Sequence, residues 1–264
     1  MMNYYQYTEH ASTFMDSFSD YYNKGKQEKR PGIGFFPGGF KPPHIGHFAA
    51  AQAIVGVDIS NPETGSSILL PGADVSDVVH VLIGHAPRGS EAQNKNWTSL
   101  KSKKTSDPGA MDALKETMIT KETSIKIWEL YLGSVDPGVS EKIDVSISPS
   151  ASPVIGMETK ILGLESDQFR NNTINLYAGQ EDQARYQYFT GDKFKMKIAE
   201  SKNVEPNMIS IKTNMLDRLG SATDARSQII RVAAQEADME TLKQYIPPGV
   251  DVLEFLNLLK TFKG

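Results

Sequence analysis

Short apolar runs alternate along the chain with longer stretches in which apolar residues recur every three or four positions. The runs are rich in β-branched and aromatic residues, which favours strands, and they cover residues 32–37, 77–84, 142–148, 173–179 and 207–212. The stretches have the period of amphipathic helices and cover residues 44–54, 121–133, 153–164, 181–189, 221–235 and 251–262. This alternation predicts an α/β fold, a mostly parallel sheet with helices on both faces.

The first 30 residues have a different pattern. Their aromatic side chains are spaced to share one face of a helix, at Phe14, Phe18, Tyr21 and Tyr22. The polar stretch that follows contains Gly25, Pro31 and Gly32, which is typical of a linker. We therefore expect an N-terminal helical extension and linker over residues 1–31, and one α/β domain with a C-terminal helical cap over residues 32–264.

Two connections are longer than the usual βα loop of roughly 2–6 residues. They cover about residues 56–76 and 86–118. The second contains a basic run that includes Arg88, Lys95 and Lys101. A solvated loop and a lid that binds an anion are both consistent with that run.

The composition limits the possible chemistry. The 264 residues carry a formal net charge of −4 and contain no cysteine. The absence of cysteine excludes disulfide scaffolds, thiolate zinc sites, iron–sulfur clusters and cysteine nucleophiles, and the acidic balance argues against a dedicated nucleic-acid-binding protein. We see no secretory signal pattern and no apolar run of 18 residues, so we expect a cytoplasmic protein without a membrane partner.

The strongest chemical signal is the segment Gly-Gly-Phe-Lys-Pro-Pro-His-Ile-Gly-His at residues 38–47, between the first expected strand and helix. In a chain of this composition, H-x-G-H is expected by chance only about 0.008 times. His44 and His47 share one face of the first helical turn, and Gly46 leaves the space between them open. We expect this helix to direct unpaired N–H groups and its positive dipole end at a phosphate ligand.

The segment resembles the G-x-F-x-P-x-H-x-G-H signature of the cytidylyltransferase-like nucleotidyltransferase superfamily. A second element of that superfamily, S-x-T-x-x-R, is matched by Ser221, Thr223 and Arg226. The resemblance implies a Rossmann-like (HUP-type) five-stranded parallel sheet of order 3-2-1-4-5. It also implies transfer of a nucleoside monophosphate from a nucleoside triphosphate to a small phosphate monoester, with Mg²⁺ held mostly by the nucleotide and by water.

The resemblance also assigns roles to individual residues. His44 and His47 would bridge the triphosphate, Lys41 would contact the attacking or α-phosphate, and Arg226 would hold the β- and γ-phosphates. The other nucleotide-binding positions are Gly38, Gly39, Phe40, Gly46, Ser221 and Thr223. The motif set favours ATP with an acceptor like nicotinamide mononucleotide, as in adenylyltransferases of phage and bacterial NAD salvage. CTP with a sugar- or polyol-phosphate is the alternative, and a homo-oligomer is compatible with the sequence.

Weaker candidates follow the other strands. Gly179, Asp182 and Arg185 resemble the superfamily's Gly-rich segment, which would contact the base, ribose or a phosphate; a helix start with acidic residues explains the same pattern. His85, Arg88 and Trp97 are candidates for the acceptor site. We interpret His80 and Trp128 as core residues.

Four other classes of protein share parts of this pattern. A class I aminoacyl-tRNA synthetase would need a K-M-S-K-S-like loop, and Lys195-Met196-Lys197 lacks the serine. P-loop kinases and Rossmann dehydrogenases lack their glycine motifs here. A non-catalytic nucleotide-binding or virion-associated protein on the same fold remains an alternative of another class.

Overall fold

The computed structural model describes about two thirds of the chain. The described residues are 30–61, 64–85, 119–217, 225, 228, 229, 232 and 238–260. The chain divides into two compact units, Met1–Pro31 and Gly32–Gly264. The expected N-terminal helix and the connection at 86–118 lie outside the described residues.

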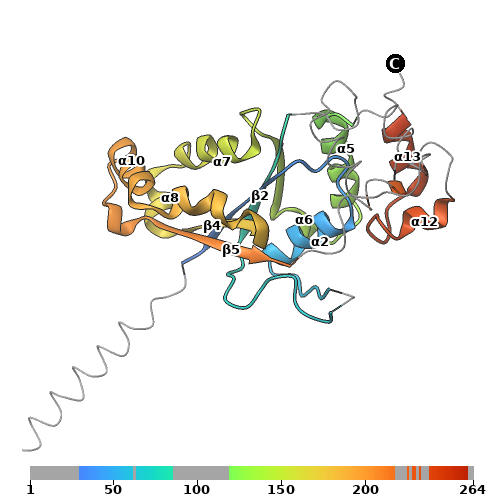
Figure 1. Ribbon diagram of the computed structural model, residues 1–264, viewed down its shortest axis with the longest axis horizontal. Helices are drawn as coiled ribbons and strands as arrows, with labels where there is room; N and C mark the ends of the chain where they lie inside the picture. Colours follow the sequence, from blue (N-terminus) through green and yellow to red (C-terminus); the bar gives the residue numbers. More distant parts are fainter. Residues whose placement is uncertain are drawn as a thin grey trace, which may run out of the picture. The chain divides into compact units, whose positions relative to one another are not determined.

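The described strands form one five-stranded, all-parallel sheet of order β3-β2-β1-β4-β5 (Figure 1). The strands are β1 (Gly32–Gly38), β2 (Val78–Ile83), β3 (Ile143–Ile147), β4 (Thr173–Gly179) and β5 (Ser210–Leu216). The predicted order 3-2-1-4-5 is thereby confirmed. The chain order reverses between β1 and β4, and a crevice at the carboxyl ends of the strands is the usual ligand site in such sheets.

Helices cover both faces of the sheet, as the alternating pattern predicted. One face packs against α2 (Ile45–Ile54), α5 (Lys121–Leu132), α12 (Met239–Lys243) and α13 (Val252–Lys260), with α6 (Pro137–Ser140) beside them. The other face packs against α7 (Pro153–Leu162), α8 (Ser166–Asn171), α9 (Gln187–Thr190) and α10 (Asp192–Lys202). Val79 and Val81 enter the first core and Leu82 the second, because side chains alternate along a strand. No helix of the described residues is long and apolar enough to span a membrane.

Two predicted elements differ from the structure. The strand expected at 207–212 begins only at Ser210, because Pro206 opens the short 3₁₀ helix η3 (Pro206–Met208). The helix expected at 181–189 is wrong: the 3₁₀ helix η2 (Gln180–Tyr186) is followed by α9, and extended Gly191 separates α9 from α10. Within the expected helix 221–235, the described positions 225, 228, 229 and 232 are helical.

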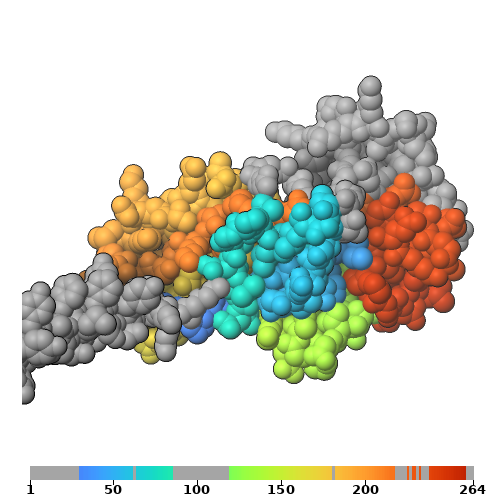
Figure 2. All heavy atoms as spheres, turned by 90° about the horizontal axis from the view of Figure 1, so that it is seen from below, coloured from blue at the N-terminus to red at the C-terminus, as the bar shows by residue number. Residues whose placement is uncertain are grey.

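The connection before β2, residues 56–76, is hydrogen-bonded to the sheet. Its Leu69 forms an antiparallel bridge with Leu216 of β5. The amide of Leu70 donates to the carbonyl of Met215 at 3.2 Å, and the amide of Asp217 donates to the carbonyl of Ile68 at 2.8 Å. Figure 2 shows this segment on the surface beside β5. The described part of the connection therefore covers the end of the edge strand.

Polar contacts hold Asp74 and Ser76, at the end of this connection, against β4. The Tyr177 hydroxyl donates to the carbonyl of Asp74 at 2.6 Å and lies 2.9 Å from the Ser76 hydroxyl. The Asn175 side-chain amide donates to the same Ser76 oxygen at 3.0 Å. Burial raises the pKa of Tyr177, so its hydroxyl stays protonated and can donate.

We expect Tyr177→Phe to lower the free energy of unfolding by about 1–3 kcal/mol, because the substitution leaves the partly buried Asp74 carbonyl and the buried Ser76 hydroxyl without this partner. Urea unfolding measures this change. Tyr188→Phe is the matched control, since Tyr188 is exposed and loss of its hydroxyl should change the free energy by less than about 0.5 kcal/mol. Equal losses in both variants would show that the buried contact adds no stability.

Candidate active site

The segment 38–47 forms the turn between β1 and α2, and His44 caps the helix. The His44 backbone is extended, at φ −139° and ψ 173°, and its Nδ1 accepts a hydrogen bond from the amide of Gly46 at 3.1 Å. An acceptor nitrogen carries no proton, so the proton of the neutral ring lies on Nε2. The cap therefore makes Nε2 of His44 a hydrogen-bond donor.

The two histidines lie against each other, as the i, i+3 spacing predicted. Their ring centroids are 3.8 Å apart, with 35° between the ring planes. The Phe40 ring meets the His47 ring edge to face, with centroids 4.9 Å apart and 79° between the planes. His44 is 4% exposed and His47 partly buried. The structure thus brings two imidazoles together directly beyond the carboxyl end of β1.

The expectation of unpaired N–H groups at the start of α2 is wrong for this structure. The amide of Ile45 donates to the carbonyl of Tyr245 at 2.8 Å, and that of Gly46 donates to the His44 side chain. The amide of His47 donates to the carbonyl of His44 at 3.0 Å. Because the cap and the C-terminal segment take these donors, anion binding here depends on side chains.

Lys41 brings a buried positive charge to the same edge of the sheet. Its side chain is 4% exposed, and Nζ donates to the carbonyl of Gly84, the residue after β2. The amide of Gly84 in turn donates to the carbonyl of Gly38 at 3.0 Å. These contacts place the ammonium group at the carboxyl ends of the neighbouring strands β1 and β2.

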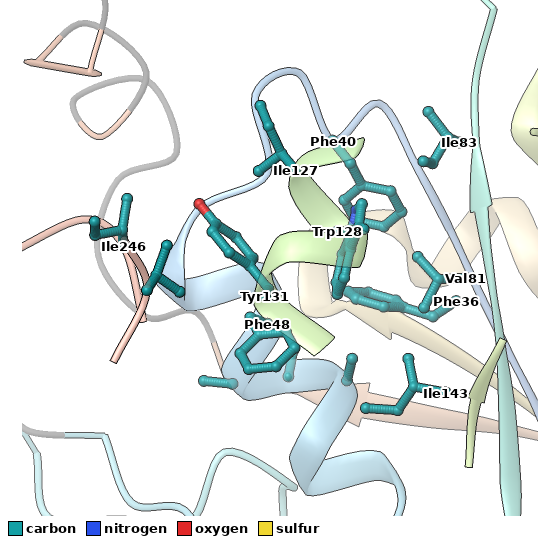
Figure 3. Close-up of a cluster of buried hydrophobic side chains, with 14 of the residues drawn as sticks. Phe36, Phe40, Phe48, Val81, Ile83, Ile127, Trp128, Tyr131, Ile143 and Ile246 are labelled. Atoms are coloured by element: carbon teal, nitrogen blue, oxygen red, sulfur yellow. The ribbon is translucent and has the colours of Figure 1, made fainter. Parts of the chain in front are cut away.

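The Phe40 ring packs between the histidine pair and the hydrophobic core. Phe40 has a left-handed backbone, φ 41°, and a 5% exposed side chain that packs on His47. The same ring packs on Phe36 and Trp128 (Figure 3). The Phe40 ring lies over Gly38, where an added Cβ would stand 2.4 Å from Cζ of Phe40. Gly38 is therefore required by the ring above it. The contact of Phe40 with a nucleotide stays a prediction.

Two residues of α5 form hydrogen bonds to carbonyls of this turn, and the sequence analysis identified neither of them. The buried Ser124 hydroxyl donates to the carbonyl of Phe40. The Tyr131 hydroxyl donates to the carbonyl of Pro43 at 3.0 Å, and burial holds its pKa well above the usual value. Both residues lie on the helix face that packs against the sheet, where the pattern indicated only core. Trp128, on the same face, is fully buried as predicted.

The predicted positions after β4 are partly explained by a local ion pair. Gly179 ends β4 and precedes η2. Asp182 and Arg185 pair with each other across one turn of η2, with Arg185 Nη1 and Asp182 Oδ1 2.9 Å apart. Contacts of these three residues with a nucleotide stay predictions.

His85 also lies at the carboxyl ends of the strands, tied to the loop after β3. Its Nε2 lies 2.6 Å from the carbonyl of Ser148, and its amide donates to the carbonyl of Ala151 at 3.3 Å. The other acceptor candidates, Arg88 and Trp97, lie outside the described residues. Ser221, Thr223 and Arg226 of the second motif lie outside them as well.

The described residues of the site do not form a metal-binding set. No group of three histidine, aspartate or glutamate side chains that could hold a metal ion occurs within the described ranges. Lys41 and the two histidines suit anions rather than Mg²⁺, which prefers oxygen ligands. Among the described residues, the groups at this site suit the phosphates of a nucleotide rather than a bare magnesium ion.

No protein-family model matches the chain, and no curated protein matches it. Among solved structures, it is similar to the nicotinic acid mononucleotide adenylyltransferase of Plasmodium falciparum. The complex of that enzyme with NaAD aligns at a TM-score of 0.45 and 11% identity, over 88% of this chain and 96% of that one. Its complex with APC aligns at 0.45 and 13%, over 87% and 97%. These identities are too low to transfer a substrate or a residue role.

Proposed function

We propose that the chain is a nucleotidyltransferase that transfers AMP from ATP to a small phosphate monoester and releases pyrophosphate. The observation that carries the proposal is the joint position of His44, His47 and Lys41 at the carboxyl ends of β1 and β2. Two imidazoles and a buried ammonium group suit a polyphosphate. The resemblance of residues 38–47 to the nucleotidyltransferase signature supports the same reaction class.

In the proposed reaction, a phosphate oxygen of the acceptor attacks the α-phosphorus of ATP in line. The new P–O bond forms as the bond to the bridging oxygen of the β-phosphate breaks, and pyrophosphate leaves with the bonding electrons. No covalent enzyme intermediate is needed, so catalysis consists of alignment and neutralisation of charge. Nε2–H of His44 and the His47 ring would donate to the triphosphate oxygens as negative charge moves toward the leaving group.

Lys41 would hold the α-phosphate and the attacking oxygen together. Its attachment to the carbonyl of Gly84 restricts the long side chain, which lowers the entropy lost when a phosphate binds. Ser221, Thr223 and Arg226 would hold the β- and γ-phosphates from a second helix.

We propose a mononucleotide such as nicotinamide mononucleotide as the acceptor, bound beside His85. The contact between His85 Nε2 and the Ser148 carbonyl fixes the imidazole between the ends of β2 and β3. A ring held in this way can recognise a polar group of the acceptor at low entropic cost. Arg88 and Trp97, which follow His85 in the sequence, would complete this part of the site.

Pyrophosphate release tests the proposal. ATP, CTP, GTP and UTP are each combined, with Mg²⁺, with nicotinamide mononucleotide, nicotinic acid mononucleotide, phosphopantetheine and glycerol-3-phosphate. We expect turnover with ATP and a mononucleotide. Turnover with CTP and glycerol-3-phosphate would instead make the protein a cytidylyltransferase. His47→Ala, purified in the same way, controls for contaminating activity.

Binding of the triphosphates alone separates the remaining outcomes. ATP binding without turnover on any acceptor would favour the non-catalytic nucleotide-binding alternative. Absence of binding to all four triphosphates would overturn the proposal, because the imidazole pair would then have no polyphosphate ligand.

A further inference from the structure

A polar pair interrupts the sheet face that packs against α7. His80 of β2 lies opposite Asp144 of β3 in the parallel register, and His80 Nδ1 is 2.7 Å from Asp144 Oδ2. Positions on the faces of a parallel sheet are usually apolar. The expectation of a core histidine is only half right, since the His80 side chain has its partner but is 24% exposed. This pair has no part in the proposed reaction.

The pair fixes the imidazole in one orientation and one tautomer. The hydrogen bond from His80 lowers the pKa of Asp144, and the charge of Lys160 lowers it further against the opposing effect of burial. The ionised carboxylate only accepts, so Nδ1 of His80 must donate. The ring also stacks on Phe35, with centroids 5.1 Å apart and 29° between the planes. No described residue bonds Nε2, the ring's other polar atom.

The histidine lines a hollow between the sheet and α7. Its volume is about 300 Å³, and its lining residues are Phe35, His80, Pro149, Thr159, Lys160, Gly163 and Leu164. Most of these are apolar, and Lys160 is the one lysine or arginine among them. Gly163 follows α7 and places no side chain in the space. The histidines of the candidate active site lie at the N-cap and in the first turn of α2, which packs on the opposite face of the sheet.

We propose that this hollow is a second binding site, for a small aromatic anion. The apolar wall of Phe35, Pro149 and Leu164 would contact the ring of the ligand, and its carboxylate or phosphate group would bind Lys160. When the imidazole is protonated, Nε2–H gives a second donor to the same group. The charges of Asp144, His80, Lys160 and a bound carboxylate then sum to zero, which limits the cost of burying them. The volume is at the lower end of the roughly 300–1,000 Å³ typical of ligand sites.

The test uses the full-length protein with histidines labelled for NMR and titrated with benzoate or phenyl phosphate. We expect saturable shifts of the His80 ring signals, which His80→Ala assigns by their loss. Benzyl alcohol, which has the ring without the charge, should bind at least about tenfold more weakly because it lacks the charge-assisted contact. Neither measurement depends on nucleotidyl transfer, so the result is separate from that of the proposed function.

Lys160→Met keeps the length of the side chain and removes the charge, and we expect it to weaken binding of both anions about tenfold. Lys193→Met is the matched control, because that lysine is exposed on α10 and should leave binding unchanged. Thermal unfolding verifies that both variants are folded. Absence of saturable His80 shifts with both anions, or equal affinity of the Lys160 and Lys193 variants, would overturn the proposal and leave Lys160 as a charge that stabilises the end of α7.

Discussion

His47→Ala should lower the rate of pyrophosphate release by at least about 100-fold, the usual loss when one preorganised donor to a developing charge is removed. The imidazole lies between His44 and Phe40, with centroids 3.8 and 4.9 Å away. The His47 ring is therefore held in place before the substrate binds, and no entropy is lost to order it in the complex. The alanine variant loses this preorganised donor. Single-turnover kinetics with ATP and the best acceptor measure the chemical step directly.

Two further variants separate chemistry from structure. Gln52 is in the same helix but away from the turn. The Gln52→Ala variant is therefore the control and should keep the wild-type rate. His44→Asn retains an N-cap acceptor while it removes the imidazole, since asparagine caps helices as well as any residue. We expect His44→Asn to be folded and about as slow as His47→Ala. A wild-type rate in either histidine variant would remove the imidazole pair from the mechanism.

Gly38→Ala should slow turnover by about 100-fold, although residue 38 carries no functional group. The new methyl group would overlap the Phe40 ring, with three ring carbons at 2.4–2.8 Å from the ideal Cβ position. The ring must move, and it is the ring on which His47 packs. A shift of about 1 Å in a catalytic group can cost about 100-fold in rate. Overpacking of this kind also lowers the free energy of unfolding by about 1–3 kcal/mol.

Gly133→Ala is the matched control for Gly38→Ala. Gly133 has an ordinary helical backbone, and an added Cβ there would meet its nearest atoms only at 3.5 and 3.6 Å. It should be active and at least as stable as the wild type. An active Gly38→Ala protein would show that the position of Phe40 does not set that of His47. The comparison uses kinetics together with urea unfolding of both proteins.

The sheet and the histidine pair could be predicted because both follow from local patterns. The β-branched runs mark the strands, and the i, i+3 spacing alone brings His44 and His47 onto one side of a turn. The S-x-T-x-x-R motif remains an expectation, since Ser221, Thr223 and Arg226 lie outside the described residues. The order of the strands came from the family resemblance, because periodicity contains no information about strand neighbours.

The features that sequence reasoning missed depend on contacts between distant segments. Ser124 and Tyr131 occupy inner positions of an amphipathic helix, and nothing in their spacing indicates that they bind the carbonyls of Phe40 and Pro43. The pairing of the Ile45 amide has the same origin, because its acceptor is the distant carbonyl of Tyr245. The amides of Gly46 and His47 are paired locally, with the side chain and the carbonyl of His44. The helix expected at 181–189 is divided into the 3₁₀ helix η2 and the short α9, because hydrophobic spacing over so few residues does not distinguish a 3₁₀ turn from an α-helical one.

The hydrogen bond from the amide of Ile45 to the carbonyl of Tyr245 has a consequence for biosynthesis. A ribosome makes the β1 turn and α2 before the acceptor for the first amide of α2, which emerges about 200 residues later. At about 5–20 residues per second, the nascent chain carries an incompletely capped α2 for roughly 10–40 seconds. The cap of α2 is thus completed only after most of the sheet and the C-terminal segment have been translated.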